Sequence, residues 1–159
     1  MINYCEYRAK PKDQTDYDYL SQAFPDKCKD GFVYGQMLID DKREHYYICV
    51  AIVTTMNCTV ANGTVTVIEV IPETICQDTK LNDKNQQKIF QHDICQVYLG
   101  AGIIMTGVVY YDKRVAAFRI DYGNGKCNLL IDILIAKGIP TWIEVIGNEF
   151  DNPELLKDE

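Results

Sequence analysis

The hydrophobic and polar positions of the N-terminal half alternate with a period of two, which is the pattern of β-strands that bury one face. This alternation predicts strands at residues 2–8, 32–39, 45–54 and 64–71. Residues 40–43 are polar and Asn62-Gly63 is a strong turn dipeptide, so both favour reversals of the chain. The three later strands are therefore predicted to form a β-meander.

The same alternation returns after residue 92. It predicts five further strands, at residues 93–99, 104–111, 115–122, 126–135 and 141–146. Residues 112–114 form a tight polar turn and residues 121–125 a glycine-rich one. Short strands at such regular spacing predict a small antiparallel barrel.

Two short helices complete the pattern. The first is predicted at residues 17–24, where Pro25 would end it. The second is predicted at residues 153–157, because Asn152 suits the N-cap and Pro153 the first helical position.

Residues 72–93 separate the two β-patterned halves. Pro72 ends the preceding apolar run, because proline lacks the N–H that a continuing strand pair needs. A polar stretch follows before Ile89 and Phe90 return the chain to a core. The prediction is thus a mainly β (α+β) fold in three parts: an N-terminal β-meander lobe at 1–71, a connecting segment at 72–93, and a barrel lobe with a C-terminal helix at 94–159.

The net charge of the chain argues against two classes of binding partner, nucleic acids and anionic membranes. The 159 residues carry a formal net charge of −7, from 23 acidic and 16 basic residues. Nucleic acids and anionic membranes both attract clustered Lys and Arg, so we expect direct contact with neither. The N-terminus lacks the pattern of a signal peptide, and Asp132 interrupts the longest apolar run, at residues 129–136. We therefore expect a cytoplasmic protein.

Seven cysteines and two histidines are the candidate ligands and nucleophiles. The cysteine count is odd and no two cysteines lie three residues apart, which fits neither a disulfide framework nor a zinc site. His45 and His92 lack metal-site spacing, and Cys76 with His92 carries no nucleophile signature. We therefore expect reduced structural thiols, no metal, no cofactor and no enzymatic activity. Asp93 is expected to accept a backbone N–H where a strand begins.

Tyrosine is the one enrichment typical of binding surfaces, with eleven in the chain. Tyr46 and Tyr47 are adjacent in a predicted strand, as are Tyr110 and Tyr111. Neighbouring residues of a strand face opposite sides, so one ring of each pair is expected outside the core. Such rings are either part of a half-solvated sheet face or an interface with a subunit or ligand.

The segment after residue 71 and the last strand carry a family resemblance. The residues concerned are Pro72-Glu73-Thr74-Ile75, Gln77, Thr79, Leu81, Asp83, Asn85, Ile89-Phe90, Asp93-Ile94, Gly107-Val108-Val109, residues 144–148 and residues 152–156. With these residues the chain resembles the YopX family of small proteins from phages and prophages of low-GC Gram-positive bacteria. The resemblance implies a β-rich fold with an SH3-like barrel in the C-terminal half, and it implies no catalytic residues.

The chain also departs from the family pattern. Cys76, Lys80, Gln86 and His92 stand where the family usually has glycine. If any of these positions requires a positive φ, the turn here must differ or be strained, because side chains disfavour that conformation.

The functional hypothesis is a non-enzymatic phage or prophage accessory protein that binds and blocks a host factor, a defence or regulatory component of the bacterial cytoplasm. We expect it to form a homo-oligomer through strand edges or exposed tyrosines. Its acidity favours a basic partner, such as a host nucleic-acid-binding protein.

The alternative is an oligomeric sponge that sequesters a small nucleotide signal. An aromatic ring would stack on the base, and Arg8, Arg43, Arg114 or Arg119 would meet the phosphates. For both hypotheses the candidate binding residues are Tyr46, Tyr47, Tyr110, Tyr111, Arg114 and Arg119.

Overall fold

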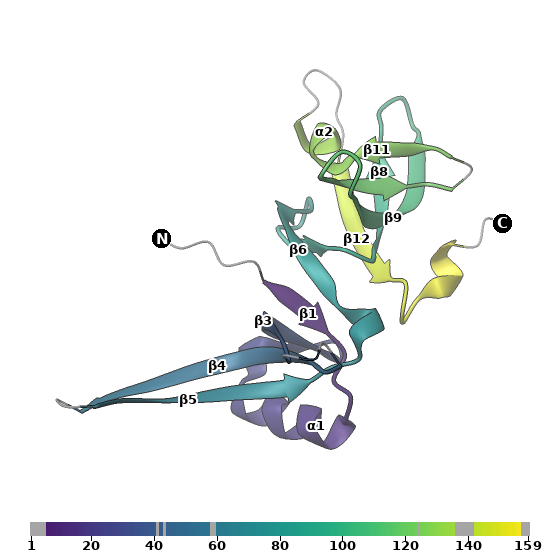
Figure 1. Cartoon of the computed structure of the whole chain (residues 1–159). Coiled ribbons are helices and arrows are strands. Elements are labelled where there is room, and N and C mark those ends of the chain that lie inside the picture. Colours follow the sequence, from purple (N-terminus) through teal and green to yellow (C-terminus); the bar gives the residue numbers. More distant parts are fainter. Residues whose placement is uncertain are drawn as a thin grey trace. The chain divides into compact units, whose positions relative to one another are not determined.

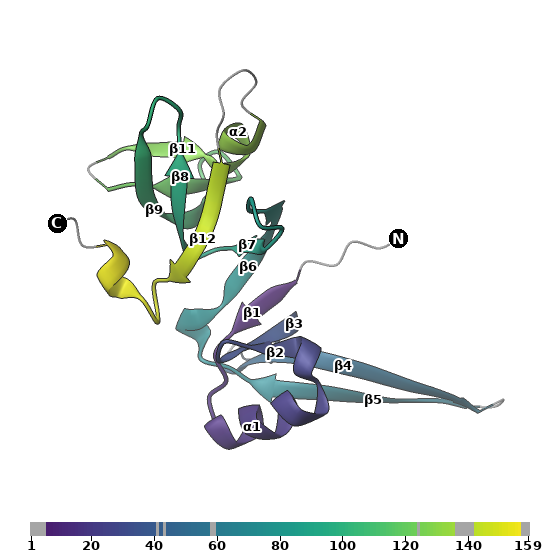
Figure 2. The same cartoon turned by 180° about the vertical axis from the view of Figure 1, so that it is seen from behind.

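The computed structural model describes residues 6–40, 42, 44–57, 60–123, 125–135 and 142–156. The chain folds into two compact units, Met1–Gln77 and Asp78–Glu159. Figure 1 and the reverse view in Figure 2 show that both are built mainly from β-strands, as the sequence predicts. The boundary between the units falls inside the segment 72–93.

The first unit is an antiparallel sheet with one α-helix. Its strands are β1 (Tyr7–Ala9), β2 (Cys28–Lys29), β3 (Phe32–Ile39), β4 (Tyr46–Asn57), β5 (Val60–Glu69) and the start of β6 (Cys76–Asn82). They lie in the order β5-β4-β3-β1-β6, and β2 pairs with β3. The helical elements are α1 (Gln14–Ala23) and the 3₁₀ turns η1 (Pro25–Lys27) and η2 (Pro72–Thr74).

Helix α1 begins earlier than the prediction of residues 17–24 because of its N-cap. The Asp13 carboxylate accepts a hydrogen bond from Thr15 N at 2.7 Å, which satisfies one of the free amides of the first turn. At the other end Phe24 N donates to Leu20 O, and Pro25 begins η1. Leu20 is the buried residue of α1.

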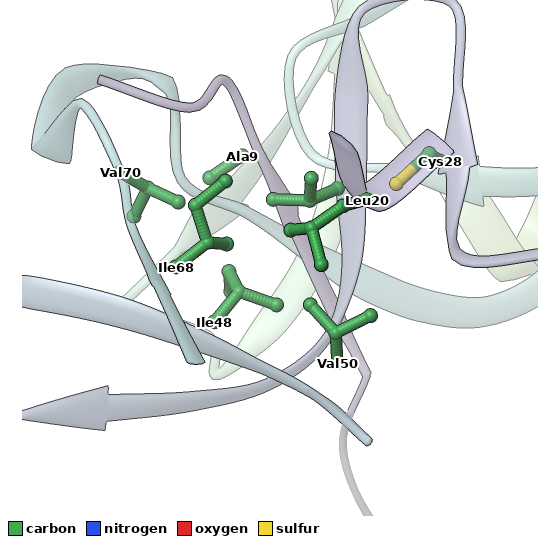
Figure 3. Packing of buried hydrophobic residues seen from close by; sticks show 8 residues of the cluster. Ala9, Leu20, Cys28, Ile48, Val50, Ile68 and Val70 are labelled. Atoms are coloured by element: carbon green, nitrogen blue, oxygen red, sulfur yellow. The ribbon is translucent and has the colours of Figure 1, made fainter. Parts of the chain in front are cut away.

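One apolar cluster holds this unit together, as Figure 3 shows. It contains Ala9, Leu20, Cys28, Val33, Ile48, Val50, Ile68 and Val70. Ile48 and Val50 are alternate residues of β4, as are Ile68 and Val70 along and just after β5, so one sheet face packs against Leu20 of α1. Each fully buried Ile or Val contributes roughly 1.5–3 kcal/mol.

The β4–β5 hairpin extends well beyond the rest of this sheet (Figure 1). β3 pairs with β4 only as far as Gln36 opposite Cys49. β4 and β5 continue to pair with each other as far as Asn57 opposite Val60. The outer part of the hairpin is thus an arm of two strands.

The second unit contains a five-stranded antiparallel sheet. Its strands are β8 (Asp93–Tyr98), β9 (Ile104–Asp112), β10 (Ala117–Asp121), β11 (Cys127–Leu129) and β12 (Trp142–Asn148), in the order β11-β10-β9-β8-β12. Its other elements are the end of β6, β7 (Lys88–Phe90), α2 (Leu130–Ile135) and the 3₁₀ turn η3 (Pro153–Leu156). Its core is Ile89, Cys95, Val97, Val109, Ile120, Leu130, Ile133 and Ile143.

Three local predictions need correction. The strand predicted at residues 126–135 ends at Leu129, and α2 follows, because Leu130 and Ile133 are buried together on one helical face. The helix predicted at 153–157 is the 3₁₀ turn η3. The connecting segment contains β6 and β7, whose pairing is interrupted between Asp78 and Asn82.

The mainly β class is confirmed, whereas the described strands do not confirm the predicted barrel. The described strands form antiparallel sheets whose path ends at β11 on one side and β12 on the other, with no closed barrel. The regular strand spacing in the sequence predicts the five strands, but it carries no information on whether the two end strands meet.

The glycine departures coincide with turns that need positive φ. Lys80, Gln86 and His92 have φ values of 64°, 65° and 67°. Cys76, the fourth departure, lies in β6 and is not among the positive-φ residues. A side chain in the left-handed region costs about 1–2 kcal/mol, so the backbone at these three positions is strained where glycine would not be.

We predict that Gln86→Gly stabilises the protein by about 0.5–1 kcal/mol, because relief of the left-handed strain outweighs the added freedom of the unfolded chain. Gln86 is exposed, so little packing is lost. Urea unfolding measures the change. Gln87→Gly is the matched control, since Gln87 is exposed and outside the positive-φ set. It should destabilise by about 0.5–1 kcal/mol, and equal destabilisation by both variants would contradict the prediction.

Candidate functional site

The six predicted binding residues fall in both units. Tyr46 and Tyr47 lie at the base of the β4–β5 arm in the first unit. The other four, Tyr110, Tyr111, Arg114 and Arg119, lie at one end of the β9–β10 hairpin in the second unit. Neither unit alone contains all six.

The two tyrosines of the first unit face opposite sides of the sheet, as predicted. Tyr46 packs against the core of that unit. Tyr47 lies on the other face, opposite Leu38 on β3 and Glu69 on β5. The ring of His45 stacks near that of Tyr47, with centroids 6.4 Å apart.

A small charged cluster surrounds Glu69 at this end of the arm. His45 Nδ1 and Lys12 Nζ lie 2.7 and 2.8 Å from the same oxygen, Glu69 Oε1. The hydrogen bond to Glu69 raises the pKa of His45 above its ordinary value. The bonds from His45 and Lys12 lower the pKa of Glu69. The cluster is an ion-paired surface group.

The buried carboxylate of Asp112 organises the four residues of the second unit. Arg114 Nε and Nη2 donate to its two oxygens at 3.0 and 2.9 Å, and Arg114 N donates to Oδ1. Arg119 Nη1 donates to Oδ2 at 3.3 Å. The Arg114 guanidinium and backbone amide lower the pKa of Asp112 to about 2. Two of the four arginines proposed for phosphate recognition, Arg114 and Arg119, are therefore bound to Asp112.

Tyr110 and Tyr111 also face opposite sides of their strand. Tyr110 lies opposite Arg119, and its pKa is raised by burial and by a hydrogen bond with Cys127. Tyr111 lies opposite Phe118, whose ring it meets edge-on at 5.2 Å. Tyr110 thus lies with the arginines and Tyr111 does not.

The second unit also displays a surface that the sequence analysis did not identify. Tyr98 of β8 lies opposite Ile104 of β9 on one side and Trp142 of β12 on the other. The Tyr98 and Trp142 rings stack at 5.7 Å with an interplanar angle of 14°. Lys84 Nζ lies 4.0 Å from the centre of the Trp142 ring. We call Ile104, Tyr98, Trp142 and Lys84 the aromatic row.

The aromatic row lies on the sheet face opposite the core. Val97 and Ile143, the sequence neighbours of Tyr98 and Trp142, are fully buried in the core, so alternation directs the two rings the other way. Ile104 is 54% exposed. Tyr and Trp rings are enriched at protein-binding surfaces.

Asp83 holds Lys84 above the indole ring. The buried Asp83 carboxylate accepts hydrogen bonds from the backbone amides of Asn85, Gln87 and Val145, at 2.8, 2.9 and 3.1 Å. Lys84 N donates to Ile143 O of β12 at 2.9 Å. These bonds attach the β6–β7 turn to the edge of β12. Lys84 Nζ also pairs with Glu144 at 2.6 Å.

The residues considered for catalysis have structural partners. The buried Cys76 thiol donates to Thr74 O at 3.2 Å. His92 Nδ1 lies 2.6 Å from Glu149 Oε2. Asp93 Oδ2 accepts from Phe90 N at 2.7 Å, which confirms its predicted capping role.

The described residues hold neither a metal-binding cluster nor a membrane-spanning helix. They contain no group of three or more His, Cys, Asp or Glu residues suited to a metal ion. Their helices are also too short or too polar to cross a membrane.

Comparison with known proteins identifies a family and similarity to solved structures. A family model described as YopX protein matches residues 6–157. The crystal structure of protein EF1440 from Enterococcus faecalis is similar, with a TM-score of 0.54 and 25% sequence identity. That match covers 77% of this chain and 86% of EF1440. No curated protein matches the chain.

We predict that the benefit of the Asp112 carboxylate disappears in acid. Its lowered pKa means that the ionised form stabilises the fold fully above about pH 4, and that this contribution is lost as the pH falls towards 2. The urea midpoint of wild type should exceed that of Asp112→Asn at pH 6, and the gap should close near pH 2. Asp121→Asn, at an exposed turn carboxylate, should stay close to wild type at pH 6. A gap independent of pH would contradict the prediction.

We also predict that His45 titrates above its ordinary value of 6.5. NMR resolves this readily because the chain has two histidines, and a His92→Asn variant assigns the signals. Glu69→Gln should lower the pKa of His45, since it removes the negative partner. An unchanged titration in Glu69→Gln would rule out the pairing.

Proposed function

The chain belongs to the YopX family, and from this premise we propose that it is a non-enzymatic phage or prophage accessory protein that binds and blocks a host factor. The factor would be a defence or regulatory protein of the bacterial cytoplasm. The observation that carries the proposal is the aromatic row on the second unit.

The aromatic row has the composition and rigidity of a binding hot spot. Two stacked rings supply large contact area, and both are fixed on paired strands rather than on loops. Ile104 extends the apolar surface, while Lys84 and Glu144 form a polar rim. Little conformational entropy would be lost when a partner binds.

The overall charge supports a basic partner. At −7 the chain attracts cationic surfaces and repels nucleic acid. A host nucleic-acid-binding protein has a basic surface of this kind. Blocking that surface would prevent the host protein from reaching its own ligand.

We also propose that the second unit is an SH3-like domain, because its strand order fits one. β8, β9, β10 and β11 follow one another as antiparallel neighbours, and β12 returns beside β8. SH3-like domains arrange their five strands in this order. The aromatic row crosses the sheet at β9, β8 and β12.

The arginine contacts favour a protein partner over a nucleotide. Arg114 and Arg119 are bound to Asp112. Arg8 is buried, with its guanidinium 4.6 Å from the centre of the Phe32 ring. Arg43 lies outside the described residues. A nucleotide would have to compete with Asp112 for Arg119 and for part of the Arg114 guanidinium, whose side chain is 82% exposed.

We predict that tagged protein captures one basic host protein from a lysate of a low-GC Gram-positive bacterium. Ile104→Lys should reduce capture at least tenfold, which corresponds to about 1.4 kcal/mol, because it places a cation against a basic partner. Trp142→Ala should reduce it further. Val115→Lys is the matched control, because Val115 is 52% exposed and lies in the turn after β9.

Thermal unfolding would first show that each variant folds. Equal capture by Ile104→Lys and Val115→Lys would contradict the proposed surface. A nucleotide released from the purified protein on heating would support the sponge instead.

A further inference from the structure

β5 has a strand neighbour on one side only. The sheet order begins with β5, and β4 is its neighbour among the described strands. At its C-terminal end the free edge is covered by residues 10–12: Lys12 N donates to Glu69 O, and Ile71 N donates to Lys10 O. From Val67 towards the tip of the arm, no described strand pairs with this edge.

The open part of the edge presents backbone groups in a regular pattern. Val70 N donates to Tyr46 O at 2.9 Å, so Val70 directs its backbone groups towards β4. Alternate residues of an antiparallel strand point to opposite sides, so Val67 and Val65 direct theirs to the free edge. Their side chains are 43% and 50% exposed. The edge therefore combines unpaired N–H and C=O groups with two exposed valines.

This edge lacks the usual protection against strand pairing. Natural edge strands carry lysine, proline or inward-pointing charges that block another strand. Between His45 and Glu69 the chain has no charged residue and no proline, although a quarter of all residues are charged. The whole arm is therefore uncharged.

We propose that the arm is a dimerisation element, in which β5 pairs antiparallel with β5 of a second copy about a two-fold axis. The charge distribution of the chain favours a second copy as the partner that pairs with this edge. Two chains of −7 repel each other over most of their surfaces, but not along this uncharged segment.

A two-fold axis near Val65 makes the pairing self-complementary. Val67 then lies opposite Gly63, and the paired stretch, residues 63–67, contains no charged residue. The two sheets join into one continuous sheet, and the free N–H and C=O groups of Val65 and Val67 gain partners. This inference goes beyond the proposed function and concerns the other unit.

The oligomeric state of the purified full chain tests whether β5 mediates dimerisation. Sedimentation between 1 and about 100 µM should give twice the chain mass of 18.2 kDa. The double variant Val65→Lys, Val67→Lys should weaken the dimer at least 100-fold, because it brings ammonium groups together across the axis. Val115→Lys, equally exposed in the second unit, should remain dimeric. Circular dichroism and thermal unfolding would confirm that both variants fold.

Amide exchange by NMR locates the interface. In the dimer the Val65 and Val67 amides should exchange slowly, and in the lysine variant they should exchange at least tenfold faster. The Ile68 amide faces β4 and should be protected in both proteins, which makes it an internal control. A monomeric wild type, a dimer that survives the lysine substitutions, or fast exchange at Val65 and Val67 would each overturn the proposal. If the Val65 and Val67 amides were protected only when a host protein is bound, the edge would be a binding site for that protein. This result would also overturn the dimerisation proposal.

Discussion

The buried carboxylate of Asp83 is the interaction on which the candidate binding surface depends. An ionised carboxylate away from water is tolerated only when hydrogen bonds replace its hydration. Three backbone amides do this for Asp83, two from its own turn and one from Val145. The bonds attach the β6–β7 turn to β12 and bring Lys84 over Trp142. The Asp83 carboxylate, which is not part of the aromatic row, therefore fixes the position of Lys84 in that row.

A buried aspartate also accompanies two further positive-φ residues of the second unit. Lys80 and His92 have positive φ, as Gln86 does beside Asp83. Each lies within three residues of a buried aspartate that accepts a backbone amide: Asp78 accepts from Lys80 N, and Asp93 accepts from Phe90 N. Charge-assisted bonds to backbone amides contribute about 1.5–3 kcal/mol, which offsets left-handed strain of about 1–2 kcal/mol. The turns therefore keep their shape without glycine.

The two units have different chemistry available for binding. The first presents an uncharged arm with exposed backbone groups, and the second presents rings and a cation fixed on paired strands. A free strand edge recognises another strand, whereas stacked rings recognise shape and apolar area.

The sequence by itself determined the mainly β class, most strand positions, the facing of the tyrosine pairs and the capping role of Asp93. Alternation and local side-chain chemistry decide these features within a few residues. The tertiary structure alone decided that β8 and β12 are neighbours, so that Tyr98 meets Trp142. It also decided that Arg114 and Arg119 bind Asp112, and that Leu130 starts a helix. These features depend on which distant segments pack together, and a period of two specifies a strand without specifying its neighbour.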